Sequence, residues 1–314
     1  MAKDTLSDYK RKKRIKEILL LIFKYFFLIS IGYIVLFQLF YMIAYAIRPY
    51  SDMYNPSVVW ITKNPTFQNF KDVIASMEYL KSFWNTFSVQ VLSAFIEVAS
   101  CAIVAYGFAR FNFPCKNLLF MFVIITILVP SQMIAVPMYL NFADFDFFGI
   151  LKLIYKVTGS DLRPNLLDSG WVFYLPSIFA SGLRSGLFIF IYRQFFVGMP
   201  KELEEAAAID GASPVKTFLH VIIPSSGVAI LTVSIFSLVW HWNEYNLSVL
   251  YFDENHPLSV RLSTLSQSLS VMGLGDNRGV RMSACLLFIL PVLLVYIVLQ
   301  RKFIQSIDRV GIVG

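Results

Sequence analysis

The chain has 314 residues, 57% of them hydrophobic and only 15% charged, and its mean hydropathy is +0.64. Soluble domains carry about 25% charged residues, so this composition excludes that class and places the chain in a lipid bilayer. The net charge of +7 does not indicate a nucleic-acid-binding protein, because basic residues cluster between Lys3 and Lys16, beside the first apolar stretch. A basic cluster at that place serves as a signal for membrane orientation and lipid headgroups.

Long apolar stretches recur along the chain. A helix needs about 20 apolar residues to cross about 30 Å of hydrocarbon, and lipid offers the backbone no hydrogen-bond partners. The sequence therefore predicts an all-α integral membrane protein with six transmembrane helices. The predicted spans are Leu19–Ile47, Phe83–Ala109, Leu118–Leu140, Trp171–Phe196, Val228–Leu250 and Met282–Gln300.

The six spans divide the remaining charges into two sides. The side with both termini holds fifteen cations and eight acids, whereas the other side holds ten of each. Because cytoplasmic loops carry the excess of Lys and Arg, both termini are predicted to be cytoplasmic. The first apolar stretch is too long for a cleavable signal and is expected to stay as a span.

The predicted spans and their orientation divide the chain into five segments. These are a basic cytoplasmic segment (1–18), a first transmembrane helix (19–47), an extracytoplasmic loop (48–82), a core with five helices (83–303) and a cytoplasmic tail (304–314). A cytoplasmic loop at 199–225 joins the fourth and fifth spans.

Enzyme and metal chemistry have no candidate residues. Cys101 and Cys285 fall within spans and Cys115 in a short loop, so packing is their expected role. His220 and His241 have no companions at metal-ligand spacing. The loops show no nucleophile and base together, which argues against a membrane-anchored enzyme.

The third span contains Pro130, Gln132 and Pro137. Proline removes a backbone donor, so this span is expected to kink beside a cavity or a partner helix. A kink that serves packing alone is the alternative.

The segment 199–225 has clear helix signals. Acidic residues follow Pro200 in a first helical turn, alanines follow them, and Gly211 ends the helix. Ser213 can cap a second helix that begins at Pro214. The sequence thus predicts two short helices folded against each other, with a flat alanine surface that another protein could approach closely. An ordinary hairpin between two spans is the alternative.

This segment resembles the EAA motif of binding-protein-dependent ABC importer permeases. The resemblance rests on Glu205-Ala206-Ala207, then Gly211, then Val221-Ile222-Ile223-Pro224. Further similar residues of the carbohydrate-uptake, maltose-permease branch are Phe108–Arg110, Phe113-Pro114, Pro137–Tyr139, Tyr192–Phe196, Trp242-Asn243 and Gln300-Arg301. From about residue 83 onward the chain looks like one such subunit, which implies the type I ABC importer permease fold.

The resemblance also implies a function. In that family the EAA loop inserts into a cleft of a cytoplasmic ATPase dimer, so that closure of the dimer on ATP changes the access of the spans. The implied coupling residues here are Glu205, Ala206, Ala207, Asp210 and Gly211. No Gly-x-x-x-x-Gly-Lys-Ser/Thr loop occurs, so ATP and magnesium are expected on a separate ATPase subunit and no cofactor on this chain.

The other implied partners are a second homologous permease and an extracytoplasmic solute-binding protein, in a bacterial or archaeal cytoplasmic membrane. Membrane lipid surrounds the assembly, and nucleic acid has no part in it. The implied cargo is a sugar or oligosaccharide. A non-sugar solute carried by the same machinery is an alternative, and an ion-driven secondary carrier is a further one that leaves the 199–225 segment without a purpose.

Polar residues inside spans are costly and default to functional hypotheses. Arg184, flanked by small residues, is expected to face the central cavity, with pairing to Glu97 or to backbone carbonyls of a kinked helix as the alternative. Rings with nearby amides and carboxylates suit sugars, although Trp also gathers at membrane interfaces. The full set of substrate-cavity candidates is Arg184, Gln132, Trp240, Trp242, Asn243 and Glu244.

Overall fold

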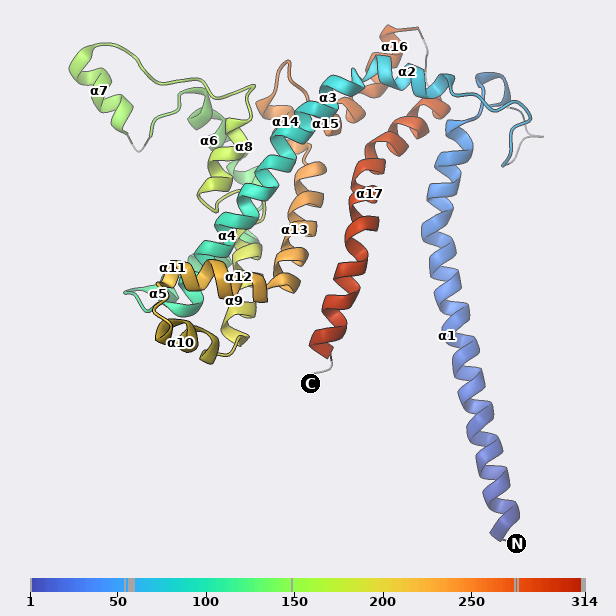
Figure 1. The fold of residues 1–314 in the computed structure, drawn as a ribbon. Coiled ribbons are helices and arrows are strands. Elements are labelled where there is room, and N and C mark those ends of the chain that lie inside the picture. Colours follow the sequence, from blue (N-terminus) through green and yellow to red (C-terminus); the bar gives the residue numbers. More distant parts are fainter. Residues whose placement is uncertain are drawn as a thin grey trace. The chain divides into compact units, whose positions relative to one another are not determined.

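The computed structural model describes residues 2–53, 55, 60–147, 149–273, 275 and 277–311, with side chains from residue 13 to residue 301 of these ranges. Pro56 of the predicted extracytoplasmic loop lies outside the described residues, as do the side chains of the predicted tail. Every regular element in the described part is a helix (Figure 1). The all-α prediction is therefore confirmed.

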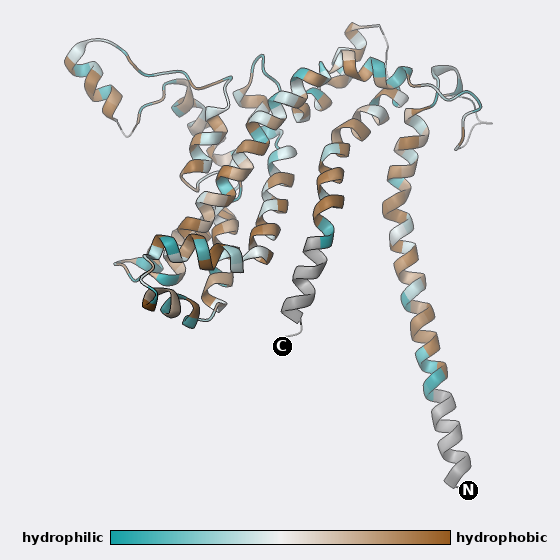
Figure 2. Ribbon diagram, viewed as in Figure 1, coloured by the Kyte–Doolittle hydropathy of each residue, from teal (hydrophilic) through white to brown (hydrophobic). Residues whose placement is uncertain are grey.

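The chain forms two compact units. The first comprises residues 1–73 with 273–287, and the second comprises residues 74–272 with 288–314. The first unit contains α1 (Ala2–Ala46), a 3₁₀ turn (Tyr50–Asp52) and the starts of α2 (Gln68–Ser76) and α17 (Arg278–Gly311). Figure 2 shows hydrophobic residues along most of the described part of α1.

The first unit is held together by a buried amide. The Asn69 side chain donates to the carbonyl oxygens of Ala46 and Arg48, at 2.9 and 2.8 Å. Gly279, near the start of α17, lies close to this amide. A Cβ added at Gly279 would lie 2.6 Å from the side-chain nitrogen of Asn69. Glycine is therefore required there to let the helix start pack.

The second unit holds the remaining helices. They are α3 (Tyr79–Asn85), a π-helical segment (Thr86–Val91), α4 (Leu92–Arg110), α5 (Lys116–Leu128), α6 (Ser131–Ala143), α7 (Ile150–Thr158), α8 (Trp171–Ile178), α9 (Ser185–Gly198), α10 (Glu202–Ile209), α11 (Pro214–Thr217), a second π-helical segment (Phe218–Ile222), α12 (Ile223–Ser225), α13 (Gly227–Trp242), α14 (Asn246–Tyr251), α15 (Leu258–Ser263) and α16 (Leu265–Val271).

Three described helices are long and apolar enough to cross a bilayer, namely Lys13–Ala46, Tyr79–Arg110 and Arg278–Arg301. Two bent pairs raise the number to five if each pair is one span; they are α5 with α6, and the stretch Pro214–Ser225 (α11 to α12) with α13. The predicted fourth span is divided, because α8 ends at Ile178 and α9 begins at Ser185. The count of six spans stays a prediction.

The third predicted span is sharply bent at proline. α5 ends at Leu128 and α6 follows from Ser131 at an angle of 102°, with Pro130 as the residue before α6. Proline has no N–H to continue the ladder and disfavours a helical residue before it. The predicted kink is therefore confirmed, while Pro137 lies inside α6.

The core of the second unit lies where α4, α9 and α13 meet. Its fully buried members include Cys101 and Ala105 of α4, Phe188 and Tyr192 of α9, and Val233 of α13. Figure 1 shows α10, α11 and α12 at one end of these helices and α14 and α15 at the other. This arrangement separates the segment 199–225 from the loops at the far end of the same helices.

Candidate functional site

The segment 199–225 folds as a hairpin of α10 and α11, which we call the coupling hairpin after the role that the resemblance implies. α10 begins with Glu202, Glu204 and Glu205 in its first turn, where carboxylates favour the positive end of the helix dipole. It ends at Ile209, and two residues later Gly211 has a φ of +75°, in the left-handed region that favours glycine and reverses the chain. The predicted helix end is confirmed.

The second helix of the coupling hairpin has the predicted cap. The Ser213 hydroxyl accepts from the backbone N–H of Lys216 at 3.3 Å, and Pro214 occupies the first turn of α11. The Gly211 and Ala212 N–H groups donate back to carbonyls of α10 at 3.0 and 2.9 Å. Local sequence therefore sets the tight reversal between the two helices.

Two contacts anchor the coupling hairpin to α4. Arg110, the last residue of α4, places its Nε 2.7 Å from a Glu204 carboxylate oxygen and donates from a terminal nitrogen to the Met199 carbonyl at 2.9 Å. The Arg110 and Glu204 side chains are 7% and 22% exposed. Phe218 packs on Tyr106 of α4, with ring centres 4.8 Å apart. Movement of the hairpin is thereby linked to a core helix.

Four of the five predicted coupling residues lie at the surface of this hairpin. Ala207 is buried against the fold, whereas the side chains of Glu205, Ala206 and Asp210 and the backbone of Gly211 are exposed. The exposed apolar residues beside them include Ile209 at 87% and Val215 at 68%. An acidic and apolar surface of this kind suits a partner groove with basic residues. The sequence reading did not identify Arg110 as the anchor, although its place at the end of a span was a signal.

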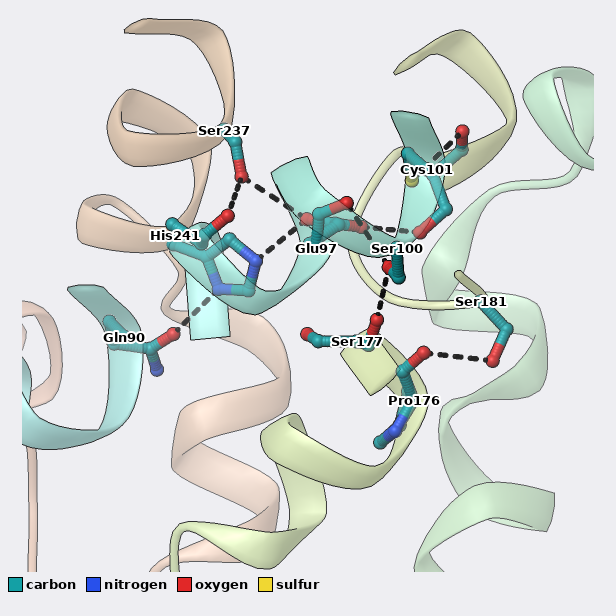
Figure 3. Close-up of polar contacts among 11 residues, drawn as sticks. Gln90, Glu97, Ser100, Cys101, Pro176, Ser177, Ser181, Ser237 and His241 are labelled. Atoms are coloured by element: carbon teal, nitrogen blue, oxygen red, sulfur yellow. Dashed lines mark hydrogen bonds and ion pairs between the residues drawn. The ribbon is translucent and has the colours of Figure 1, made fainter. Parts of the chain in front are cut away.

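A buried polar network, which we call the Glu97 network, joins α4, α9 and α13 (Figure 3). Glu97 is 0% exposed, and its two carboxylate oxygens have different partners. Ser185 donates to one oxygen at 2.5 Å, while His241 Nε2 lies 2.9 Å from the other and Ser237 donates to that oxygen at 3.3 Å. The sequence reading treated His241 as isolated, because its partner lies 144 positions away.

The network continues toward the start of α4. His241 Nδ1 lies 3.2 Å from Gln90 Oε1, and Gln90 Nε2 donates to the Ser248 hydroxyl at 3.1 Å. Both ring nitrogens of His241 thus lie within hydrogen-bonding distance of side-chain oxygen atoms. The expected alternative of an Arg184–Glu97 pair is not the arrangement found, because Ser185 and His241 take both carboxylate oxygens.

Arg184 lies in the break between α8 and α9 rather than inside a continuous span. Its φ is +62°, and its side chain is exposed, with the guanidinium carbon 5.8 Å from the centre of the Trp240 ring. The small residues around it do permit close approach, as predicted. A Cβ at Gly186 would lie 2.8 Å from the Val123 carbonyl oxygen of α5.

The other substrate-cavity candidates differ in exposure. Gln132 and Asn243 are exposed, Trp240 is half-buried, and Glu244 is half-buried with a carboxylate oxygen accepting from the Leu247 N–H at 2.8 Å.

Trp242 requires a correction. It is 3% exposed, packs on Phe83 and Phe288, and donates its indole N–H to the Phe288 carbonyl at 3.1 Å. Its ring and its only donor are thus used in packing.

At the end of the second unit away from the coupling hairpin, Asp168 closes the loop that follows α14. One of its carboxylate oxygens accepts from the backbone N–H groups of Asp253, Glu254 and Asn255, at 3.1, 3.2 and 3.0 Å. Partial burial alone would raise the pKa of Asp168, but these hydrogen bonds outweigh it and hold the pKa below its ordinary value. Within the described residues, no group of three or more His, Cys, Asp or Glu side chains could hold a metal ion.

Known proteins resemble this chain over most of its length. The osmoprotective compounds uptake permease protein of Synechocystis is 28% identical over 271 residues, which cover 83% of this chain and 82% of that protein. The diacetylchitobiose uptake system permease protein of Streptomyces coelicolor is 24% identical over 278 residues, covering 88% and 92%.

The fold has a counterpart among solved structures. A chain from a bacterial ABC transporter involved in the import of the acidic polysaccharide alginate matches with a TM-score of 0.71 and 19% identity, covering 90% of this chain and 95% of that one. The expected ABC importer permease fold is therefore confirmed.

A family model described as the binding-protein-dependent transport system inner membrane component matches residues 100–309, which include the coupling hairpin and the Arg110 anchor. Members of this family are permease subunits, and the ATPase of their transporters is a separate subunit. The expectation that this chain is not an enzyme is therefore confirmed. This chain therefore belongs to the family of inner membrane components of binding-protein-dependent ABC importers.

Proposed function

We propose that this permease subunit imports a sugar or oligosaccharide, and that its coupling hairpin carries the movement of a cytoplasmic ATPase dimer to the spans. Support for the cargo comes from relatives that carry diacetylchitobiose and alginate. The osmoprotective-compound relative supports a non-sugar solute as the alternative cargo. The ATPase binds ATP and magnesium in this scheme.

The coupling proposal rests on one observation: the hairpin is fixed to the fold on one side and exposed on the other. One side is fixed to the fold through the Arg110–Glu204 ion pair and Phe218, whereas Glu205, Ala206 and Ile209 are exposed. A rigid exposed surface joined to a core helix can transmit a push or pull. Glu205, Ala206, Asp210 and Gly211 are the residues that we assign to this contact, and Ala207 supports them from the buried side of α10.

The placement follows from the charges. The coupling hairpin lies on the cytoplasmic side, because the cation excess of the sequence is on the side that holds residues 199–225 and both termini. The loops that include Asp168 then face outward, toward an extracytoplasmic solute-binding protein. A second homologous permease completes the pathway across the cytoplasmic membrane.

The proposed cargo contacts are Arg184, Gln132, Trp240, Asn243 and Glu244. Arg184 and Trp240 lie together, and the pair offers a ring face for an apolar sugar surface and a charged donor for hydroxyl groups. Trp242 is left out because its ring is packed and its N–H is already donated.

The test of coupling is affinity purification of the complex in mild detergent from its native membrane, comparing wild type with Gly211→Pro. Proline cannot adopt a φ of +75° and has no N–H to donate to Ala208. We expect a second permease and an ATPase to accompany the wild-type chain, and the ATPase to be lost from the variant. A chain that purifies alone, with uptake that an uncoupler abolishes and that needs no ATPase, would establish a secondary carrier instead.

The test of the cargo is uptake by proteoliposomes that contain the purified complex and its binding protein. Labelled oligosaccharides are compared with a labelled osmoprotective solute at equal concentration, with and without ATP inside. ATP-dependent accumulation of an oligosaccharide supports the proposal. Accumulation of the osmoprotective solute alone refutes the sugar assignment and leaves the coupling assignment standing.

A further inference from the structure

The Glu97 carboxylate contacts the residue that follows each member of the Arg184–Trp240 pair. Its Oε1 accepts from Ser185, which directly follows Arg184, and its Oε2 lies 2.9 Å from Nε2 of His241, which directly follows Trp240. The buried Glu97 side chain therefore holds α9 at the residue after Arg184 and α13 at the residue after Trp240.

The backbone around Arg184 needs such support. Ala180 and Arg184 have φ values of +51° and +62°, in a region that disfavours residues with a side chain. Strained conformations of this kind persist only where the surroundings over-determine them. Glu97 provides that constraint through Ser185 and through Gly182, where an added Cβ would lie 2.9 Å from Glu97 Oε1.

The other side of the carboxylate is equally fixed. His241 is 1% exposed and lies between Glu97 and Gln90, while Gln90 donates onward to Ser248 of α14. Glu97 and His241 are both buried, so removal of either partner leaves a polar group of the other without its hydrogen bond in an apolar surrounding. The contact with Glu97 thus fixes α13 at His241, next to Trp240.

We propose that Glu97 is the positioning residue for the Arg184–Trp240 pair, holding the guanidinium and the ring in register where cargo passes. This inference rests on the proposed function, because it takes Arg184 as a cargo contact. Glu97 itself is 0% exposed and touches no cargo; it acts through Ser185 and His241.

The experiment is a double-mutant cycle in the full reconstituted complex with its binding protein. Solute carried per ATP hydrolysed is measured for wild type, Glu97→Gln, Arg184→Ala and the double variant. We expect each single variant to lower this ratio about tenfold while ATP hydrolysis continues. We expect the double variant to be no worse than Arg184→Ala, because both changes remove the same contact.

The control is Ser93→Ala. Ser93 is also fully buried on α4, and its hydroxyl has no hydrogen-bond partner among the residues that the structure describes, so this variant should transport as wild type does. Should Glu97→Gln fail to assemble, Ser185→Ala takes its place in the cycle, since it removes only the hydrogen bond to Oε1.

The outcomes separate the two claims. Effects of Glu97→Gln and Arg184→Ala that multiply to about a hundredfold would show independent roles and overturn the positioning inference alone. If Arg184→Ala carries as much solute per ATP hydrolysed as wild type, Arg184 is not a cargo contact and the positioning inference is overturned. The proposal of ATPase coupling through the hairpin would still stand.

Discussion

Replacing Arg110 by Gln should release the coupling hairpin from α4. The change removes the ion pair with Glu204 and the hydrogen bond to the Met199 carbonyl, both made by a side chain that is 7% exposed. Breaking a fully buried pair costs about 3–5 kcal/mol, and an exposed pair contributes about 0–1 kcal/mol. Because Glu204 is 22% exposed, we expect a loss of about 2 kcal/mol, or about thirtyfold in the docked population of α10.

Hydrogen exchange of the α10 amides in the assembled complex measures this directly. The amides of Glu202–Ile209 should exchange about tenfold or more faster in Arg110→Gln, and transport per ATP should fall. Lys116→Gln is the matched control, since Lys116 is a cation near the same end of α4 whose ammonium donates to the Phe111 carbonyl. Unchanged exchange in α10 together with normal transport would refute the idea that this ion pair anchors the hairpin.

Three further predictions concern backbone and charge. Gly211→Ala should weaken the hairpin reversal by about 1–2 kcal/mol and reduce ATPase co-purification, whereas Gly227→Ala, which meets no atom within 4 Å at ordinary φ, should not. Gly186→Ala should lower thermal stability in detergent by about 1–3 kcal/mol by forcing α5 from α9, and Gly198→Ala in the same helix should leave it unchanged. Asp168 has a folded pKa below its unfolded value, so its stabilisation is complete above about pH 4 and is lost as pH falls through the folded pKa. Asp168→Asn should therefore lower the melting temperature at pH 7, and the difference from wild type should shrink as the pH is lowered through the folded pKa.

The sequence was sufficient for features that depend on neighbours along the chain. The helix signals at Ser213 and Pro214 and the stop at Gly211 act within one or two turns, so the coupling hairpin could be predicted residue by residue. Pro130 likewise bends the third predicted span through its own missing N–H.

Contacts between distant helices could not be predicted in this way. Arg110 and Glu204 were both visible as charges near span ends, but only the packing of α10 under α4 brings them within 2.7 Å. The contact of α13 with α17 turns Trp242 inward to Phe288, although an aromatic residue near a span end also suits an interface or a ligand.

Sequence by itself determined the helical class of this protein, its membrane character and the coupling hairpin, because composition, caps and turns act locally. Only the tertiary structure decided that Glu97, Ser185 and His241 form one buried network and that Arg184 lies over Trp240. The physical reason is that a charge buried in an apolar bundle needs partners, and the rotation and depth of each helix, set by packing of whole faces, determine which side chains reach it.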